Sequence, residues 1–295
     1  MTPLVFSLPD NEVFADRLAG GIGGERGEVV LRRFPDGESY VRVEAEVEGR
    51  PTVVTCTLDR PDGKVLPLFF LAETLRDLGA AEVGLVAPYL AYMRQDRRFE
   101  PGEGVTARYF GPMVSRHVDW LATVDPHLHR LDSLDDVYDV PTAAVGAAPV
   151  IAGWVERHVD RPLIVGPDEE SEQWVADVAA DAGAPHVVLE KERRGDREVD
   201  VSVPDVEQFR DRVPILVDDI VSTGQTMIET VGHLVEADLP APVCAAVHGV
   251  FADEADAKLA GAGARGVVTT DTIPHPTNEM TVVPRVAQAV GRLHG

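Results

Sequence analysis

Two carboxylates and a run of small polar residues make residues 213–226 the strongest candidate for chemistry in this sequence. Asp218 and Asp219 follow an apolar run, and a Ser/Thr/Gly stretch leads from them into a helical pattern. Ligands of open α/β sheets bind at the carboxyl ends of strands. Small residues there let backbone N–H groups approach a phosphate, and the N-terminus of the next helix favours negative charge. An acidic strand end with an ordinary helix cap is the alternative. The two carboxylates suit ribose hydroxyls, or a metal on them, so the segment predicts a sugar-phosphate loop with the candidates Asp218, Asp219, Ser222, Thr223, Gly224, Gln225 and Thr226.

A second group of candidates, Arg94, Gln95 and Asp96, comes shortly after the apolar run 83–87. Arg94 can hold a phosphate through two parallel hydrogen bonds, which a lysine cannot do. Arg-Gln-Asp as a bare pattern is more often a solvated loop. The position of the three residues at the end of a predicted strand is what favours a binding role.

Two cations, Lys191 and Arg193, follow the predicted strand 186–189 and precede a charged stretch that contains glycine. Cations placed in this way can stabilise the charge that develops on phosphates as a bond breaks. Lys191 is one of only three lysines among 27 basic residues, which makes a surface-filling role a weaker interpretation. A solvated charged turn is the alternative.

Two candidate metal ligands, His127 and Asp168, also follow apolar runs. A carboxylate is an ordinary ligand of Mg²⁺, whereas a histidine nitrogen is an unusual one, so spacing alone predicts no metal role for His127. A hydrogen-bonded structural histidine is the alternative there, and His129 competes with it. For Asp168 the alternative is an N-cap of the helix that begins near Ser171.

The elements that must position these residues alternate along the chain. Short β-branched runs alternate with helical patterns, which indicates parallel sheets covered by helices. The small, Pro-bounded stretch 141–149 marks a domain junction, so we predict domains at 1–145 and 146–295, with the last helix able to pack back on the first domain. The expected strands are 29–33, 40–43, 52–57, 83–87, 120–124, 163–165, 186–189, 213–217, 243–247 and 266–269. The expected helices are 65–78, 105–116, 171–181, 225–237, 253–262 and 282–293.

Composition limits the class of protein. The chain has 295 residues, of which 44% are hydrophobic, enough for two domains with sizeable cores. Fifty acidic residues face 27 basic ones, and this net charge of −23 leaves no basic nucleic-acid footprint. No apolar run approaches the ~20 residues of a membrane span, and the N-terminus has no secretory signature. We therefore expect a cytoplasmic protein without nucleic-acid or membrane partners.

The scarcity of lysine and the excess of acid are typical of proteins from salt-loving microbes, because high salt screens self-repulsion. A merely acidic mesophilic protein is the alternative. Cys56 and Cys244 lie in apolar runs and are expected to be buried free thiols.

Taken in order, these segments resemble the phosphoribosyl pyrophosphate synthetase (ribose-phosphate diphosphokinase) family. The loop after residue 217 is similar to the ribose-phosphate loop that this family shares with phosphoribosyltransferases. The turn Arg-Phe-Pro-Asp-Gly-Glu at 33–38 resembles the family's adenine contact, often made from a neighbouring subunit. Phe34 can stack on a base, and Asp36 and Glu38 can accept hydrogen bonds from its amine. Alone, this turn is an ordinary hairpin with Asp-Gly in it.

The resemblance implies two phosphoribosyltransferase-type (type I) α/β domains with mainly parallel sheets. It implies transfer of the diphosphate of Mg·ATP to ribose 5-phosphate, in nucleotide biosynthesis, by a homodimer or hexamer. The roles that it implies are catalysis for Lys191 and Arg193, Mg²⁺ binding for His127 and Asp168, and ATP binding for Phe34, Asp36, Gly37, Glu38, Arg94, Gln95 and Asp96.

Two other functions stay open, a phosphoribosyltransferase and a non-catalytic regulatory partner of a synthetase. The chain also departs from the family at Glu169-Glu170-Ser171, which is bulkier and more acidic than usual, and at Ser222, where many members have Asp. These departures indicate a divergent member.

Overall fold

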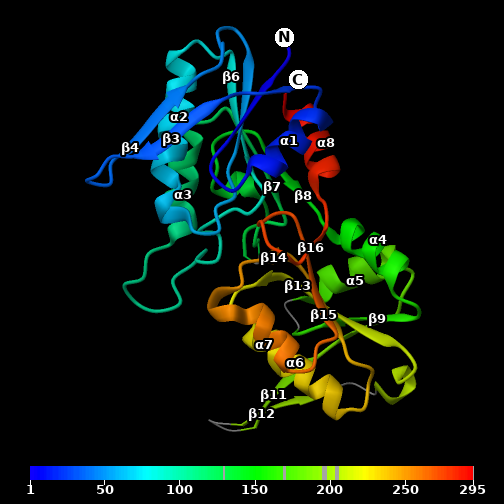
Figure 1. Cartoon of the computed structure of the whole chain (residues 1–295). Coiled ribbons are helices and arrows are strands. Elements are labelled where there is room, and N and C mark those ends of the chain that lie inside the picture. Colours follow the sequence, from blue (N-terminus) through cyan, green and yellow to red (C-terminus); the bar gives the residue numbers. More distant parts are fainter. Residues whose placement is uncertain (129, 169–170, 195–197, 203–205, 295) are drawn as a thin grey trace. The chain divides into compact units, whose positions relative to one another are not determined.

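The computed structural model of the chain describes residues 1–128, 130–168, 171–194, 198–202 and 206–294 (Figure 1). The chain forms two compact units. Unit 1 consists of Met1–Val145, Thr272–Pro274 and Val282–Gly295, and unit 2 of Gly146–Asp271 and His275–Thr281. The predicted division into 1–145 and 146–295, with the last helix able to pack back on the first domain, leaves out only the short return at Thr272–Pro274.

Unit 1 is built on a six-stranded sheet in which all strand pairs are parallel, in the order β2-β1-β5-β6-β7-β8. Apolar residues occupy both faces of the central strands, because helices cover both faces of a parallel sheet. The strands are β1 (Leu4–Ser7), β2 (Glu25–Arg26), β5 (Pro51–Thr55), β6 (Glu82–Ala87), β7 (Trp120–Val124) and β8 (Thr142–Val145).

Helices lie on both faces of this sheet (Figure 1). On one face are α2 (Val65–Asp77) and α3 (Thr106–Ser115), and on the other are α1 (Glu12–Gly21) and the C-terminal α8 (Val283–Leu293). The short segment that returns to unit 1 before α8 is attached by a hydrogen bond from the Thr57 hydroxyl to the carbonyl of Thr272.

An antiparallel hairpin of β3 (Val29–Arg33) and β4 (Ser39–Val43) completes unit 1 and packs through β4 on α2. Its half-buried apolar residues Val29, Leu31, Val41 and Val43 contact the core between the sheet and α2. The turn at the end of the hairpin is exposed.

Unit 2 has a second six-stranded parallel sheet, in the order β10-β9-β13-β14-β15-β16. Its helices are α4 (Ala148–His158), which packs on α5 (Glu172–Asp181), and α6 (Gln225–Glu236), which packs on α7 (Ala255–Gly261). A separate antiparallel pair is formed by β11 (Glu190–Arg194) and β12 (Glu198–Ser202). The sheet strands are β9 (Pro162–Gly166), β10 (His186–Val188), β13 (Val213–Val221), β14 (Val243–Gly249), β15 (Gly266–Thr270) and β16 (Asn278–Met280).

The prediction of two α/β units with mainly parallel sheets is confirmed. The first boundary between the units, at Val145 and Gly146, lies within the predicted junction 141–149, which also contains β8 and the start of α4. The helix expected at 253–262 begins only at Ala255, because three residues before it, at 251, 253 and 254, have left-handed backbone angles. Short 3-10 helices also occur among the described residues, at Pro61–Gly63, Leu134–Asp136, Val206–Phe209 and Ala252–Glu254.

Among the described residues, no helix combines enough length and apolar character to cross a membrane. Both cysteines are buried free thiols, and burial raises the pKa of each to about 12.

Candidate functional site

The acidic pair of unit 2 lies inside a strand and not after it. β13 continues through Asp218 and Asp219 to Val221, because this part of the strand pairs with β14, with Asp218 opposite Ala246 and Val221 opposite Gly249. The expected strand end at 217 is therefore wrong by four residues. Pairing with a long neighbour extends the strand beyond its apolar run.

Burial is the main reason that the pKa of Asp218 is raised well above its ordinary value. The charges of Asp219 and then Asp168 raise it further, while a hydrogen bond from the backbone N–H of Asp219 to Asp218 Oδ1, at 2.9 Å, opposes the change. Three carboxyl groups thus interact at the carboxyl ends of the adjacent strands β9 and β13. Such a group favours a ligand that brings hydroxyl donors or a cation.

The turn after β13 brings the loop candidates to the start of α6. Gly224, the residue before the helix, has φ +68°, a left-handed angle that a side chain rarely adopts. None of the described side chains caps α6, so its first N–H groups are not satisfied by a capping side chain. Thr223 is exposed and Ser222 and Thr226 are half-buried. The backbone and hydroxyls of this turn therefore form an anion-binding arrangement.

The side chain of Gln225 does not take part in this anion-binding arrangement. Its Nε2 donates to Glu229 Oε1 at 2.7 Å, one turn further along α6. Its backbone belongs to the first turn of the helix, while its amide is engaged with the helix surface.

Asp168 follows β9 and takes part in the carboxylate group through its charge on Asp218. The helix α5 begins at Glu172, and Ser171 is its N-cap residue, so Asp168 does not cap α5. The Ser171 hydroxyl donates to the carbonyl of Asp168 at 2.6 Å. Glu169 and Glu170, the acidic departure from the family pattern, lie outside the described residues.

The backbone of Lys191 and Arg193 belongs to β11, where Lys191 pairs with Val201 and Arg193 with Val199. The sequence predicted no strand between residues 189 and 213. The segment 198–202, Glu-Val-Asp-Val-Ser, alternates polar and apolar residues with the period of a strand, and this pattern explains the pairing. The side chains of both cations lie outside the described part of the structure.

In unit 1, Arg94 lies in the segment that follows β6, and its side chain is exposed between buried Met93 and half-buried Gln95. The segment is attached to its neighbour by the Tyr92 hydroxyl, which donates to Asp62 in the stretch after β5. Burial and this hydrogen bond raise the pKa of Tyr92 to about 12. Arg94 therefore points to solvent from a segment that the bond between Tyr92 and Asp62 holds in place.

Asp96 differs from its two neighbours in being buried. Its side chain is 1% exposed, and Arg130 Nη1 lies 3.5 Å from Oδ1. Neither carboxylate oxygen has a hydrogen bond in the described structure. Asp96 therefore has an ion-pair partner within unit 1, and its contact with a nucleotide stays a prediction.

The metal candidate His127 is half-buried in the segment after β7, two residues beyond Asp125, which has a left-handed φ of 31°. His129 lies outside the described residues. In the part of the chain that the structure describes, no three His, Cys, Asp or Glu side chains form a group able to hold a metal ion. His127 belongs to unit 1 and Asp168 to unit 2.

The turn that joins β3 to β4 is a hairpin turn closed by backbone hydrogen bonds between Phe34 and Glu38 at 2.8 Å and between Gly37 and Phe34 at 2.9 Å. Gly37 has φ +94°, and Asp36 accepts a hydrogen bond from the N–H of Glu38. Phe34 is 39% exposed, with Tyr40 edge-on to its ring. The turn therefore presents an aromatic face and two carboxylates to solvent.

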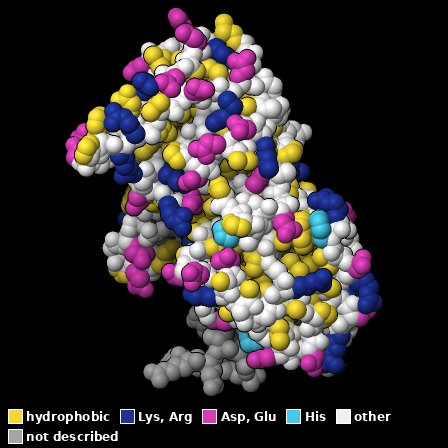
Figure 2. Space-filling view, in the orientation of Figure 1, with side chains coloured by type: hydrophobic (Ala, Val, Ile, Leu, Met, Phe, Trp, Pro, Cys, Tyr) yellow, Lys and Arg dark blue, Asp and Glu magenta, His cyan; other side chains and the backbone are white. Residues whose placement is uncertain are grey.

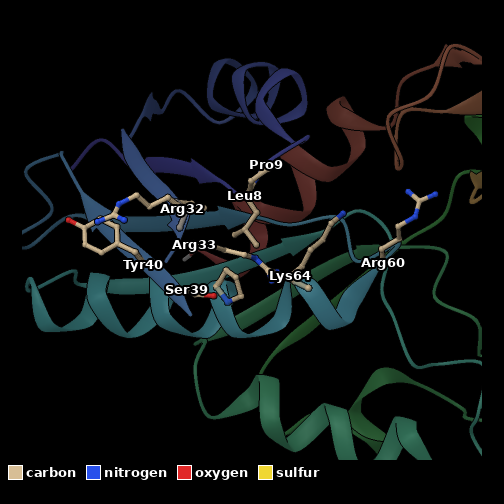
Figure 3. A pocket seen from close by; sticks show the side chains of 11 residues that line it. Leu8, Pro9, Arg32, Arg33, Ser39, Tyr40, Arg60 and Lys64 are labelled. Atoms are coloured by element: carbon tan, nitrogen blue, oxygen red, sulfur yellow. The ribbon is translucent and has the colours of Figure 1, made fainter. Parts of the chain in front are cut away.

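The sequence did not point to one further feature, a pocket in unit 1 lined by four cations (Figure 3). They are Arg32, Arg33, Arg60 and Lys64. Because these residues come from two segments about thirty positions apart and form no local motif, no spacing rule brings them together.

Two known domain families match this chain, one in each half. Residues 4–116 match the model of the N-terminal domain of ribose phosphate pyrophosphokinase, and residues 135–280 match the phosphoribosyl transferase domain. The ribose-phosphate pyrophosphokinase of Methanopyrus kandleri is 35% identical over 294 residues, which cover 99% of this chain and 100% of the relative. That of Halobacterium salinarum is 34% identical over 290 residues, which cover 97% and 100%.

Among solved structures, a phosphoribosylpyrophosphate synthetase from Mycobacterium smegmatis matches with a TM-score of 0.87. The match covers 100% of this chain and 99% of that one at 24% identity, and it supports the fold. Together with the two domain models and relatives of the same length, it confirms the fold expected from the motifs. The chain therefore belongs to the ribose-phosphate pyrophosphokinase family of enzymes.

Proposed function

We propose that this chain transfers the diphosphate group of Mg·ATP to the C1 hydroxyl of ribose 5-phosphate, giving 5-phosphoribosyl 1-diphosphate and AMP. The observation that carries the proposal is the match, over 99% of the chain, to a relative named ribose-phosphate pyrophosphokinase. The geometry of each unit agrees with a part of this reaction.

Unit 2 is proposed to hold ribose 5-phosphate. The uncapped start of α6 and the hydroxyls of Ser222, Thr223 and Thr226 suit the 5-phosphate. Asp218 and Asp219 suit the ribose hydroxyls, because a hydroxyl donor relieves carboxylates that are held close together. Gly224 contributes its backbone angle and no side-chain contact.

Unit 1 is proposed to hold ATP. Exposed Arg94 suits a phosphate, and Gln95 beside it suits the nucleotide. Phe34, Asp36 and Glu38, on the exposed turn with Gly37, suit adenine. If that turn serves a neighbouring subunit, the enzyme is a homo-oligomer, a dimer or a hexamer.

Mg²⁺ fits the donors present, since the carboxylate of Asp168 is a group that this ion prefers. Asp168 would hold it, and His127 is a second candidate ligand. When bound, the ion neutralises charge on the phosphates of ATP.

In the reaction the C1 oxygen of ribose 5-phosphate forms a bond to the β-phosphorus of ATP and loses its proton to solvent. The bond between the β-phosphorus and the α,β-bridging oxygen breaks, and AMP leaves with that oxygen. Lys191 and Arg193 are proposed to stabilise the charge of the diphosphate in transfer. Positioning and electrostatic stabilisation account for most of such a step.

Phosphorus NMR of the purified chain with Mg·ATP and ribose 5-phosphate in strong salt tests the proposal. We expect AMP and a sugar diphosphate to appear together. Lys191→Ala should lower turnover by about 10²-fold or more, as for removal of a group that stabilises transition-state charge, while nucleotide binding persists. Lys258→Ala is the matched control, since Lys258 is an exposed lysine of α7.

Equal turnover of the two lysine variants would show that Lys191 is not catalytic. Release of ADP in place of AMP would contradict diphosphate transfer. Release of AMP in the absence of any nucleobase would exclude a phosphoribosyltransferase, and lack of turnover at every Mg²⁺ and salt concentration would favour a regulatory partner.

A further inference from the structure

A pocket of about 310 Å³ in unit 1 lies between the β3–β4 hairpin and the segment that follows β5 (Figure 3). In Figure 3, Arg32 lies beside Tyr40 at one end and Arg60 at the other, with Arg33 and Lys64 between them. None of the described residues that line the pocket is Asp or Glu. None of the side chains proposed above for ATP, ribose 5-phosphate or Mg²⁺ lines the pocket, although Arg33 is the first residue of the turn that carries Phe34.

The two hairpin arginines are held in place by neutral groups. Arg33 Nη2 donates to the carbonyl of Gly63 at 3.2 Å. The guanidinium of Arg32 lies 4.1 Å from the centre of the Tyr40 ring and 4.8 Å from that of Phe34. Neither arginine forms a salt bridge with a carboxylate of the described residues. In a chain with 50 acidic and 27 basic residues, whose visible surface shows many Asp and Glu side chains (Figure 2), two such arginines at one pocket are unusual.

The two cations after β5 share one carboxylate. Lys64, whose side chain is 18% exposed, donates to the carbonyl of Thr57 at 2.9 Å and to Asp59. Arg60, 81% exposed, lies 3.3 Å from the other oxygen of Asp59. One negative charge therefore offsets only one of these two cations, and the pocket keeps a net positive charge.

The start of α2 adds to this field. Lys64 is the N-cap residue of this 13-residue helix, and none of the described side chains caps it. The partial positive charge of a helix N-terminus and unused N–H groups both favour an anion. A planar guanidinium and a partly buried ammonium are the pair that recognises a phosphate.

We propose that this pocket is a binding site for a phosphate group, held between Arg33 and Lys64. The ligand is inorganic phosphate or the phosphate of a small phosphorylated molecule, and the apolar walls at Leu8 and Tyr40 can contact an organic part. A volume of this size accommodates a phosphate with a small substituent.

Calorimetric titration of the full-length protein with inorganic phosphate, at a fixed KCl concentration, tests the site. Arg33→Gln removes one cation and should weaken binding at this site about tenfold, since a hydrogen bond between charged groups is lost. Arg42→Gln is the matched control, because Arg42 lies on the same hairpin but is paired with Glu44 and does not line the pocket. Equal weakening by both variants would show a general effect of charge and overturn the proposal.

Hydrogen exchange locates the bound phosphate. We expect protection of residues 57–67 in the parent protein and in Arg42→Gln, and its loss in Arg33→Gln and Lys64→Gln. If Lys64→Gln does not fold, because its bonds to Thr57 and Asp59 are structural, Arg33→Gln alone decides the result. Protection confined to residues 221–227 of unit 2 would contradict the proposal while leaving the proposed function intact.

Phenyl phosphate as a second probe separates the two sources of the ligand. Tighter binding than inorganic phosphate, lost in Arg33→Gln, would indicate a phosphorylated organic molecule. Equal or weaker binding of the ester, with inorganic phosphate still bound, would indicate the free ion. Failure of both probes to protect residues 57–67 would end the proposal.

Discussion

Asp218 lies where burial and two neighbouring carboxylates oppose its ionisation. A group whose pKa is raised on folding contributes stability at low pH, and this contribution is lost as the pH rises through the folded pKa. Asp218 therefore lowers the stability of the parent protein at neutral pH, although the proposed sugar site uses its carboxyl group. Such a conflict between stability and function is common at binding sites.

Asp218→Asn should raise the thermal midpoint in the absence of divalent ions, because an amide has no charge to bury. The gain over the parent protein should be small near the ordinary carboxyl pKa of ~4 and should grow toward pH 8. Thermal melts in EDTA across this range measure it, and binding of ribose 5-phosphate should weaken in the same variant.

The control is Asp177→Asn, since Asp177 is an exposed residue of α5. It should leave the midpoint nearly unchanged at every pH. A lower midpoint for Asp218→Asn at all pH values would show that its carboxylate is stabilising and would contradict the buried, repelled state.

Local sequence indicates which contiguous residues lie together, but it does not show which distant residues become their neighbours. Asp218 to Thr226 follow one another, so one strand and one helix start bring them together. The burial of Asp96 depends on Arg130, 34 positions further on, and no pattern near Asp96 indicates it. The pocket proposed for phosphate could not be predicted for the same reason, since Arg33 and Lys64 come together only when the hairpin packs near the start of α2.

At the scale of elements, the pairing of β6 with β7 depends on a glycine. Gly84 lies opposite Trp120 in the register of the two strands, and a Cβ at Gly84 would lie 2.0 Å from the Trp120 ring. The Trp120 ring is buried and fills the space that a side chain at position 84 would need. These strands carry the segments of Arg94 and His127, so this packing positions the proposed ATP residues.

Gly84→Ala should destabilise the protein by about 1–3 kcal/mol, the usual cost of overpacking in a core. Denaturant unfolding followed by tryptophan fluorescence measures the change. Gly266→Ala is the control, since a Cβ at Gly266, also in a strand, would meet no atom within 4 Å. Equal stability of Gly84→Ala and the parent protein would mean that the Trp120 ring has room to move.

The central strands could be predicted because their buried apolar runs are distinctive, as in β6 and β7. The edge strand β8 was missed because its sequence, Thr-Ala-Ala-Val, is short and has only one fully buried residue. β1 was missed although it is fully buried, since its four residues, Leu-Val-Phe-Ser, are too few to show a period. The helices α1 and α4 were missed too. The β11–β12 pair was missed because its charged residues concealed the alternation of polar and apolar residues in β12.

At the scale of the whole molecule, the order of motifs over nearly the full chain indicated the family more specifically than any single motif. The return of the last helix, α8, to unit 1 agrees with the prediction that it could pack back on the first domain, whereas the return at Thr272–Pro274 could not be predicted from the order of motifs. It depends on contacts such as that between Thr57 and Thr272, which are 215 positions apart. Family membership now rests on relatives that match this chain from end to end.

The central claim is that the C1 oxygen of ribose 5-phosphate attacks the β-phosphorus of ATP. Ribose 5-phosphate labelled with ¹⁸O in its C1 hydroxyl, incubated with the protein and Mg·ATP, tests it by phosphorus NMR. We expect the isotope shift on the product phosphorus bonded to C1 oxygen, with none in AMP. Label found in AMP, or a product in which the shifted phosphorus belongs to a single transferred phosphate, would contradict the mechanism.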